Sequence, residues 1–235
     1  MIDLQGFSVT YPGFRLEPMS VQIHAGERVA LVGPNGSGKS TTMRAMAGRL
    51  QTYDGVVRWQ GTDIRHAGPE VRASIGVLPE TVAVYPELTV REHFRLASHF
   101  YPTWDDAYLG ALCESLGLDI GKKAGDMSKG TRVKFAFVLA EAYRPPLLLL
   151  DEPTSGLDPG ARGELLAAVR RAVGGASGRA VIFSTHILED IDAIADRVLV
   201  LQRGRLILDA PLHEIRANQG ARSIAAVLYE MLGAA

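Results

Sequence analysis

Eight residues near the start of the chain have the types and spacing of a loop that binds phosphate groups. They read Gly33-Pro-Asn-Gly-Ser-Gly-Lys-Ser40 and fit the pattern G-x-x-x-x-G-K-[ST] at every fixed position. Glycine tolerates the backbone angles that let successive N–H groups converge on an anion. The ammonium of Lys39 is expected to reach the β- and γ-phosphates, and the hydroxyl of Ser40 to bind Mg²⁺. This phosphate loop therefore predicts a site for a nucleoside triphosphate.

A second group of reactive side chains follows a run of four leucines. Residues 147–150 predict a buried strand, and Asp151 and Glu152 come directly after it. Ligands of open α/β sheets bind at the carboxyl ends of the strands. We therefore expect Asp151 to hold Mg²⁺, directly or through water, and Glu152 to orient or deprotonate an attacking water. The alternative is an ordinary strand that ends in a solvated acidic turn, and the presence of the phosphate loop favours the catalytic interpretation.

The segments around the phosphate loop are those needed to position it. Residues 28–32 predict a buried strand, and residues 41–47 predict a helix that ends at Gly48. In the order strand, glycine loop and helix, the positive end of the helix points at the bound phosphates. Further strands are predicted over residues 2–10, 19–23, 56–59, 75–78, 147–151, 180–184, 198–202 and 206–208.

Residues 88–143 differ in character and predict a helical insert between two parts of an α/β core. Thr89 is a predicted N-cap, and Glu92 follows at the spacing of a capping box. Ser128 is the predicted N-cap of a later helix. The predicted helices cover residues 89–100, 105–116, 128–143, 160–173 and 188–195, followed by two helical segments in the tail.

Composition limits the class of protein. The chain has 235 residues, of which 47% are hydrophobic, and this suits one large α/β domain. A net charge of −1 argues against nucleic acid as the main ligand, and the single Cys113 excludes an internal disulfide framework. The start of the chain lacks the pattern of a signal peptide, and its apolar runs are far shorter than the about 20 residues of a membrane span. We expect a soluble chain whose membrane part, if it acts at a membrane, is another chain.

With these segments placed, the chain resembles the ATP-binding subunits of ABC transporters over essentially its whole length. Five further elements match that family in order. They are Tyr11 as the adenine-stacking aromatic, Leu78-Pro79-Glu80 at the Q-loop, Met127 to Thr131 at the signature loop, Ser155 to Asp158 at the D-loop, and His186 as the switch histidine. Order and spacing together make this resemblance far more specific than any one motif.

The resemblance implies an α/β fold, a P-loop ATPase core with an N-terminal antiparallel β-subdomain and a helical insert. The expected division of the single domain is a core over residues 1–80 and 144–210, a helical subdomain over 81–143 and a helical tail over 211–235. The implied activity is Mg²⁺-dependent hydrolysis of ATP by two such domains that close head to tail on two ATP molecules.

The resemblance also implies a role for each matching residue. ATP is expected to contact Tyr11, Gly33, Pro34, Asn35, Gly36, Ser37, Gly38, Lys39, Ser40 and Thr41. Catalysis is expected from Lys39, Glu152 and His186, and metal binding from Ser40, Glu80 and Asp151. Contacts with the second subunit and its ATP are expected from Ser128, Lys129, Gly130 and Asp158. Simpler alternatives are a turn aromatic packed on Pro12 for Tyr11, a strand-end histidine for His186 and a helix cap for Asp158.

Three positions depart from the common form of the family. Glu80 stands where glutamine is usual, and Lys129 and Thr131 replace a glycine and a glutamine of the signature. Because Ser128 and Gly130 remain, we interpret the changes as marks of a subgroup. The combination resembles ATPases that serve separate membrane subunits of the ABC-2 exporter type.

The implied partners are an integral membrane permease and a second ATP-binding domain, identical or different, with no nucleic acid. The implied location is cytoplasmic, on the inner face of the cell membrane and held there by the permease. The permease is expected to dock on the insert and on the apolar residues Val82, Val84, Tyr85 and Leu88, which could equally pack the insert onto the core. Two competing functions are a soluble ABC-type ATPase acting on DNA or ribosomes and a P-loop kinase.

Overall fold

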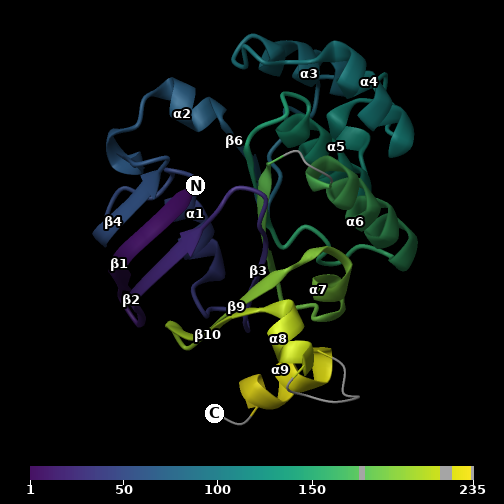
Figure 1. Ribbon diagram of the computed structural model, residues 1–235. Helices are drawn as coiled ribbons and strands as arrows, with labels where there is room; N and C mark the ends of the chain where they lie inside the picture. The colour runs from purple at the N-terminus through teal and green to yellow at the C-terminus, as the bar shows by residue number, and fades with distance from the viewer. Residues whose placement is uncertain (175–177, 218–223, 234–235) are drawn as a thin grey trace.

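The computed structural model describes residues 1–174, 178–217 and 224–233, and it contains two β-sheets and helices around them (Figure 1). The strands are β1 Ile2–Tyr11, β2 Phe14–Ile23, β3 Arg28–Val32, β4 Asp54–Trp59, β5 Thr62–Asp63, β6 Ile75–Leu78, β7 Leu147–Asp151, β8 Ala180–Thr185, β9 Arg197–Gln202 and β10 Arg205–Pro211. The helices are α1 Lys39–Met46, α2 Pro69–Ala73, α3 Val90–Ser98, α4 Asp106–Ser115, α5 Lys129–Glu141, α6 Pro159–Val173, α7 Glu189–Ile194, α8 Leu212–Ala217 and α9 Ile224–Gly233. Two short 3₁₀ turns cover Ile64–His66 and Ala124–Asp126.

The larger sheet has six strands in the order β10-β9-β3-β8-β7-β6. Strands β9, β3, β8, β7 and β6 are parallel, and only β10 at the edge runs antiparallel to its neighbour. The carboxyl ends of the central strands β3, β8 and β7 therefore meet at one edge of the sheet. The segments that follow these strands are the phosphate loop, His186 and the pair Asp151 and Glu152.

This sheet is covered on both faces, which explains the continuous apolar run of β7. Leu148 and Leu150 pack in a cluster that includes residues of α5 and α6. Leu147 and Leu149 point to the other face and pack in a cluster with α1 and the smaller sheet. All four leucines are at most 1% exposed. Because successive leucines of β7 point to opposite faces of the sheet, this one strand contributes to both hydrophobic clusters.

The smaller sheet is antiparallel, with the order β2-β1-β4-β5, and stands to the left in Figure 1. The predicted fold class, an α/β core with an N-terminal antiparallel β-subdomain, is confirmed. The second strand begins at Phe14 and not at residue 19 as predicted. Pro18 reads as a strand breaker in the sequence, but it lies at a register shift where Glu17 and Pro18 together stand opposite Ser8. A bulge of this kind tolerates a proline within a strand.

The helical segment, formed by α3, α4 and α5, lies at the upper right of Figure 1. Its helices begin where the capping residues predicted. Thr89 and Glu92 form a complete capping box, and Ser128 caps α5 by accepting a hydrogen bond from Thr131 N at 3.2 Å. The first and third helices end two residues before the predicted limits. The treatment of residues 81–143 as a separate subdomain stays a prediction. The short β5 and α2 were not predicted, because elements of two and five residues carry no readable periodicity.

The predicted helical tail corresponds to α8 and α9, at the bottom of Figure 1, while residues 218–223 and 234–235 lie outside the described residues. Val227 and Leu228 of α9 are buried in the same cluster as α5 and α6. The side-chain amide of Gln202, at the end of β9, donates a hydrogen bond to Leu232 O at 2.9 Å. Among the described residues, none of the helices combines the length and the apolarity needed to cross a bilayer.

Candidate nucleotide site

The phosphate loop connects β3 to α1. Glycine stands at the positions of this loop where a side chain would clash with neighbouring atoms. A Cβ on Gly33 would lie 2.1 Å from Leu201 O, and a Cβ on Gly38 would lie 2.7 Å from a methyl group of Leu16. Gly36 and Gly38 have φ angles of 78° and 111°, in the region that favours glycine. The backbone can therefore wrap more tightly here than residues with a Cβ would allow.

Two features of this loop suit an anion. Gly38 is the N-cap of α1 and offers no side-chain cap to the first N–H groups of the helix, which leaves them for a ligand. The hydroxyl of Ser37 is buried and has no hydrogen-bond partner among the residues that the structure describes. Unpartnered donors at a helix N-terminus are what a phosphate group requires. Thr41, one helical turn into α1, is also buried.

The side chain of Lys39 is enclosed at the base of this loop, with 5% of it exposed. Its Nζ donates hydrogen bonds to Gly33 O at 2.8 Å and to Pro34 O at 3.3 Å. The same atom lies 3.1 Å from Oε1 of Glu152, whose side chain is 7% exposed. The predicted phosphate-binding cation and the predicted catalytic carboxylate are therefore in direct contact.

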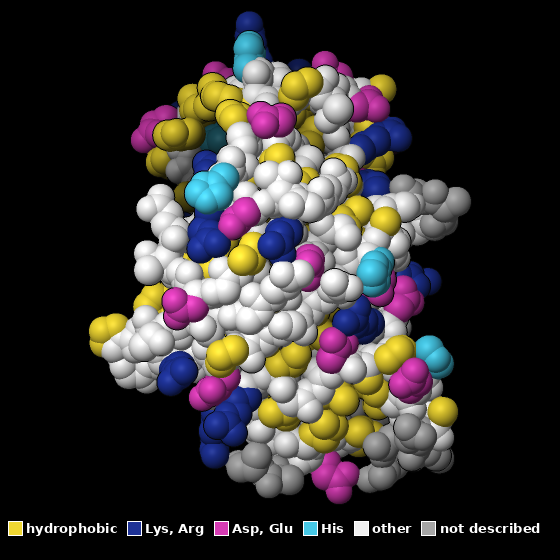
Figure 2. Space-filling model, turned by 60° about the vertical axis from the view of Figure 1, so that its left-hand side comes forward, with side chains coloured by type: hydrophobic (Ala, Val, Ile, Leu, Met, Phe, Trp, Pro, Cys, Tyr) yellow, Lys and Arg dark blue, Asp and Glu magenta, His cyan; other side chains and the backbone are white. Residues whose placement is uncertain are grey.

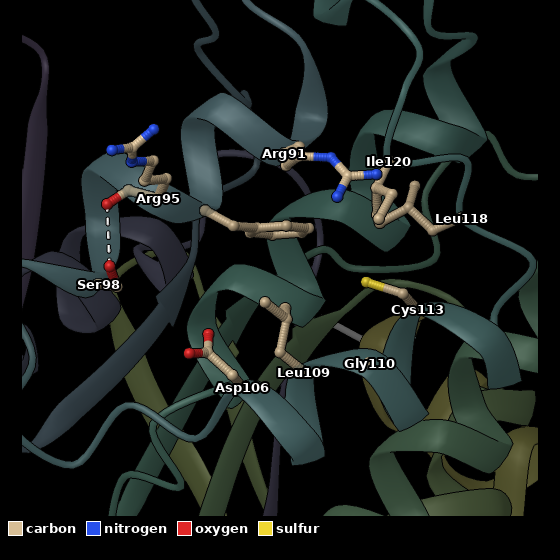
Figure 3. A pocket seen from close by; sticks show the side chains of 10 residues that line it. Arg91, Arg95, Ser98, Asp106, Leu109, Gly110, Cys113, Leu118 and Ile120 are labelled. Carbon is tan, nitrogen blue, oxygen red and sulfur yellow. Dashed lines mark hydrogen bonds between the residues drawn. The ribbon is translucent and has the colours of Figure 1, made fainter.

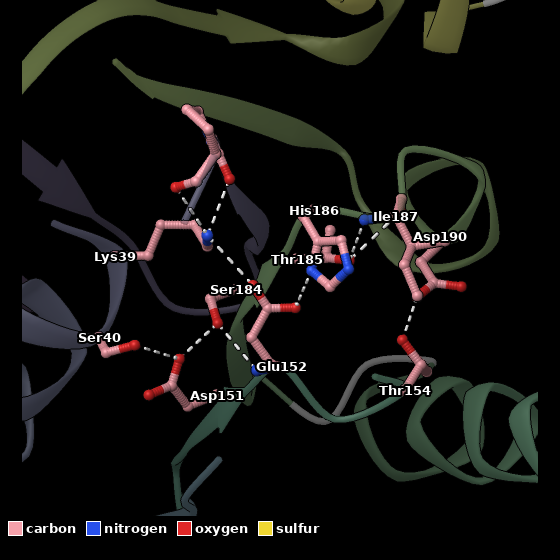
Figure 4. Close-up of polar contacts among 12 residues, drawn as sticks. Lys39, Ser40, Asp151, Glu152, Thr154, Ser184, Thr185, His186, Ile187 and Asp190 are labelled. Carbon is pink, nitrogen blue, oxygen red and sulfur yellow. Dashed lines mark hydrogen bonds and ion pairs between the residues drawn. The ribbon is translucent and has the colours of Figure 1, made fainter. Parts of the chain in front are cut away.

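Ser184 organises the two carboxylate residues at the end of β7 (Figure 4). Residues Asp151 and Ser184 are paired in the register of β7 and β8. The Ser184 hydroxyl donates to Asp151 Oδ1 at 2.6 Å and accepts from the Glu152 N–H at 2.8 Å. Ser40 donates to the same Asp151 Oδ1 at 3.2 Å. The sequence analysis did not assign Ser184 a role. Its only signal is a polar residue near the end of an otherwise apolar strand.

Glu152 is held from both sides. Its Oε2 lies 2.7 Å from Nδ1 of His186, and its Oε1 faces Lys39, so one carboxylate bridges the histidine and the lysine (Figure 4). With the proton on Nδ1, His186 donates to Glu152 and leaves its second nitrogen for another partner. Glu152 also has a φ angle of 50°, a left-handed conformation that costs on the order of 1–3 kcal/mol in a residue other than glycine and concentrates at functional sites.

The oxygen atoms of Ser40 and Asp151 fit the requirements of Mg²⁺. This ion prefers hard oxygen donors and is held by one or two protein groups together with substrate phosphates. The described residues contain no cluster of three or more histidine, cysteine or acidic side chains that could hold a metal ion alone. Glu80, the third predicted ligand, is exposed and contacts neither Ser40 nor Asp151 in the described structure.

Tyr11 lies at the end of β1, with 37% of its surface exposed. Its ring stacks against Phe14 with a centroid distance of 6.5 Å and an interplanar angle of 23°. Phe14 in turn lies against Gly38, since a Cβ there would be 3.3 Å from the Phe14 ring. The aromatic pair therefore borders the phosphate loop, and contact of Tyr11 with adenine stays a prediction.

The residues predicted to meet a second subunit lie on other elements. Ser128 caps α5, its hydroxyl lies 2.9 Å from that of Thr131, and Lys129 and Gly130 form the first turn. Asp158 accepts a hydrogen bond from Ala161 N at 3.0 Å, and this bond lowers the pKa of its carboxyl. Asp158 is thus a helix cap, and its dimer contact stays a prediction. None of the hydrogen bonds or ion pairs of the described chain joins these residues to its own phosphate loop.

A separate cavity of about 430 Å³ lies between α3 and α4, away from the phosphate loop (Figure 3). Figure 3 shows the sulfur of Cys113 directed into it. The thiol is 7% exposed, and burial raises its pKa. Cys113 is therefore a small buried side chain with a free thiol.

The geometry can now be set beside known proteins. The family model described as "ABC transporter" matches residues 16–155. A model described as "AAA domain, putative AbiEii toxin, Type IV TA system" matches the shorter stretch of residues 121–191, which begins before the signature loop and ends within α7.

Curated relatives carry related descriptions. The chain is 34% identical to the daunorubicin resistance ATP-binding protein DrrA3 of Streptomyces coeruleorubidus, over 94% of this chain and 71% of that one. It is 32% identical to the Nod factor export ATP-binding protein I of Rhizobium meliloti, over 90% of this chain and 64% of that one. It is also 32% identical to YdbJ of Bacillus subtilis, an uncharacterized ABC transporter ATP-binding protein, over 84% of this chain but 64% of that one. The chain thus spans about two thirds of the length of these relatives.

Solved structures agree with the fold. One described as the ATP binding subunit of an ABC transporter superposes with a TM-score of 0.87 at 31% identity, over 99% of both chains. The ATP-binding cassette MJ0796, solved as a dimer in a post-hydrolysis state with ADP and Pi, superposes with a TM-score of 0.79 at 22% identity, over 90% of this chain and 99% of that one.

Proposed function

The chain belongs to the family of ABC transporter ATP-binding proteins, and from this premise we propose that it hydrolyses ATP to drive a separate membrane permease. The observation that carries the proposal is the position of Glu152, held between Lys39 and His186 beside the oxygen pair of Ser40 and Asp151. This arrangement places a cation, a base and a metal-binding pair at the carboxyl edge of one sheet, where the phosphates of a nucleotide would lie.

Binding of ATP engages groups that the fold already holds in place. The N–H groups of the phosphate loop and Lys39 contact the β- and γ-phosphates, while Tyr11 stacks on the adenine. Ser40 and Asp151 hold Mg²⁺, which when bound supplies positive charge to the phosphate oxygens. Ser184 keeps Asp151 in this orientation through its 2.6 Å hydrogen bond. Phosphoryl transfer depends mainly on such positioning and charge stabilisation.

Hydrolysis uses the carboxylate of Glu152 and the ring of His186. When Lys39 turns to the γ-phosphate, Oε1 of Glu152 is released and can accept a hydrogen bond from the attacking water. His186 stays on Oε2 and fixes the direction of the carboxylate, while its second ring nitrogen faces the γ-phosphate. The left-handed backbone at Glu152 turns this side chain back toward the phosphate loop.

A second ATP-binding domain completes each site in this proposal. The free N–H groups at the start of α5, with Ser128 and Gly130, form a second anion-binding helix end. The phosphate loop of the same chain does not contact them, which suits contact with the ATP of another subunit. MJ0796, a protein of the same fold, has been solved as a dimer.

The permease is proposed to dock on a groove between α3, α5 and the segment after β6. The groove has a volume of about 460 Å³, and three exposed hydrophobic side chains border it: Tyr85 at 62%, Leu96 at 47% and Phe100 at 69% exposure. Figure 2 shows hydrophobic side chains gathered over the top of the molecule, where α3 lies. Val82 and Val84, also predicted as anchors, are half-buried against the hydrophobic core, and Val84 lines the groove as well. One relative is described as an export protein and another as a drug-resistance protein, and we propose that this chain also drives export. In this proposal the permease holds the chain at the inner face of the cell membrane.

The test is the ATPase rate of Glu152→Gln beside the wild type, in the presence and absence of Mg²⁺. We expect loss of the base to lower the rate by about 100-fold or more while ATP still binds. Glu114→Gln, which neutralises an exposed carboxylate on α4, serves as the matched control and should keep the wild-type rate. Equal rates for Glu152→Gln and the wild type would remove Glu152 from the active site.

A further inference from the structure

Two of the three residues that depart from the family form, Glu80 and Lys129, border the same cavity. The cavity has a volume of about 440 Å³ and adjoins the nucleotide site. Glu80 enters it from the segment after β6, Lys129 and Arg132 from the first turn of α5, and Glu152 and Ser155 from the segment after β7. Residues from three distant parts of the sequence thus meet there.

Lys129 extends over the D-loop of its own chain. A Cβ on Gly156 would lie 2.4 Å from Lys129 Nζ and 3.4 Å from its Cε, so the lysine side chain occupies the space that the glycine leaves. Gly156 also has a φ angle of 68°, which favours glycine at this position. The side chain of Lys129 is exposed, and its ammonium lies beside Gly156 at the edge of the cavity.

The charges of the cavity are unevenly paired. Glu152 is already matched by Lys39 and His186. Within the described chain, neither Glu80 nor Lys129 forms an ion pair within 4.0 Å. The Nε of Arg132 is buried without a partner. The cavity thus holds one carboxylate without a counter-ion, opposite two cations without a carboxylate.

The size of the cavity decides whether these charges influence one another. A cavity of about 440 Å³ brings the residues that line it to separations on the order of the roughly 10 Å over which 0.1 M salt screens a charge. Protein walls also lower the effective dielectric below that of water, which strengthens the interaction. Both side chains are exposed, so an interaction between them is of the modest, salt-dependent kind found between surface charges.

We propose that Lys129 is the counter-charge of Glu80 within one subunit, so that the two departures from the family form are a single compensated change. Lys129 acts as a positioning residue: it balances the carboxylate that would otherwise add negative charge beside Glu152 and the triphosphate. The proposal rests on the proposed function, because it concerns the binding of Mg²⁺ and ATP at that site.

A double-mutant cycle tests the coupling with Glu80→Gln, Lys129→Gln and the double variant. The readouts are the dissociation constant of Mg–ATP and the Mg²⁺ concentration for half-maximal binding. Both are measured at protein concentrations where the chain is monomeric, so that a contact between subunits contributes nothing. We expect Lys129→Gln to weaken Mg–ATP binding by about three- to tenfold in the wild type, but by less than about twofold in the Glu80→Gln background, where no carboxylate is left to balance.

Two further measurements separate charge coupling from general damage. In 1 M salt, where the screening length falls to about 3 Å, the coupling should disappear. The charge-swapped pair Glu80→Lys with Lys129→Glu should recover binding that each single swap loses. Lys122→Gln, an exposed lysine outside the cavity, should combine additively with Glu80→Gln.

Additive effects of Glu80→Gln and Lys129→Gln in a protein that binds Mg–ATP normally would overturn the proposal. That result would leave the proposed function intact. A wild-type protein that fails to bind or hydrolyse Mg–ATP would instead overturn the proposed function itself.

Discussion

At the scale of single residues, one hydroxyl links the metal-binding and the catalytic halves of the site. Ser184 is fully buried and joins Asp151 to the backbone of Glu152. The residues of the phosphate loop could be predicted because their motif is a spacing along the chain. The role of Ser184 could not, because it depends on the register of β8 against β7, which brings together residues 33 positions apart.

Ser184→Ala should therefore weaken the site as well as the fold. The change leaves the Glu152 N–H and one bond of Asp151 unsatisfied in a buried place, at a cost of about 1–3 kcal/mol in the free energy of unfolding. Asp151 then loses its fixed direction, and we expect the Mg²⁺ concentration for half-maximal ATPase to rise. Tyr143→Phe is the matched control, because it also removes a buried hydroxyl, bonded to Ile75 O at 3.1 Å, but away from the site. It should lower stability and leave the Mg²⁺ titration in place. The same titration for both variants would contradict the role given to Ser184.

At the scale of elements, the starts of helices could be predicted where the capping residues lie close together in the sequence. Thr89 with Glu92 predicted the start of α3 to the residue, because a capping box is encoded within four positions. The predicted start of β2 was wrong, because β2 accommodates Pro18 only through a register shift against β1. Local chemistry therefore sets where helices begin, whereas partner strands decide where strands begin.

The capping box makes the stability of α3 depend on pH. Hydrogen bonds from the Thr89 N–H and hydroxyl lower the pKa of Glu92. Because the pKa is lower in the folded state, this contribution is complete above the unfolded pKa of about 4.3 and is lost as the pH falls through the folded value. Glu92→Gln should thus be less stable than the wild type at pH 7, and the difference should shrink in acid. Urea unfolding at pH 7, 4.5 and 3 measures it. A difference that stays constant across these values would exclude the charged cap.

Removing the other half of the cap gives a second comparison, made at a single pH. Thr89→Ala should lower the free energy of unfolding by about 1 kcal/mol at pH 7, as expected for loss of an N-cap hydroxyl. In the Thr89→Ala background, Glu92→Gln should have a smaller effect than in the wild type, since the two side chains bond to each other.

At the scale of the whole molecule, the sites are made by segments that the sequence keeps far apart. The nucleotide site joins β3, β7 and β8, and the proposed docking groove joins the segment after β6 to α3 and α5. The sequence predicted Tyr85 as an anchor from its apolar neighbourhood. Leu96 and Phe100 were missed, because only the folded helix shows that they leave their apolar surface exposed.

Charge in the groove should release a membrane partner without disturbing ATP binding. Tyr85→Glu and Phe100→Glu each place a carboxylate on the exposed apolar surface, where a desolvated contact with a partner could not accommodate it. We expect the integral membrane protein that co-purifies with the tagged wild type from detergent-solubilised membranes to be lost. Ile207→Glu, at another exposed hydrophobic residue, on β10, should retain it. Undiminished co-purification of the groove variants would assign these side chains to packing within the chain.

The contact between Lys39 and Glu152 has a consequence for affinity. The most enclosed cation of the site already holds an anion from its own chain, so an arriving triphosphate must displace an internal competitor. The binding free energy of ATP therefore includes the cost of breaking this ion pair. Because Glu152→Gln removes the competing anion, it should bind nucleotide more tightly than the wild type. The same displacement frees the carboxylate of Glu152 beside His186, so that binding of ATP also releases the group that acts on the attacking water. A ligand too short to reach Lys39 would bind the phosphate loop and leave the ion pair between Lys39 and Glu152 intact.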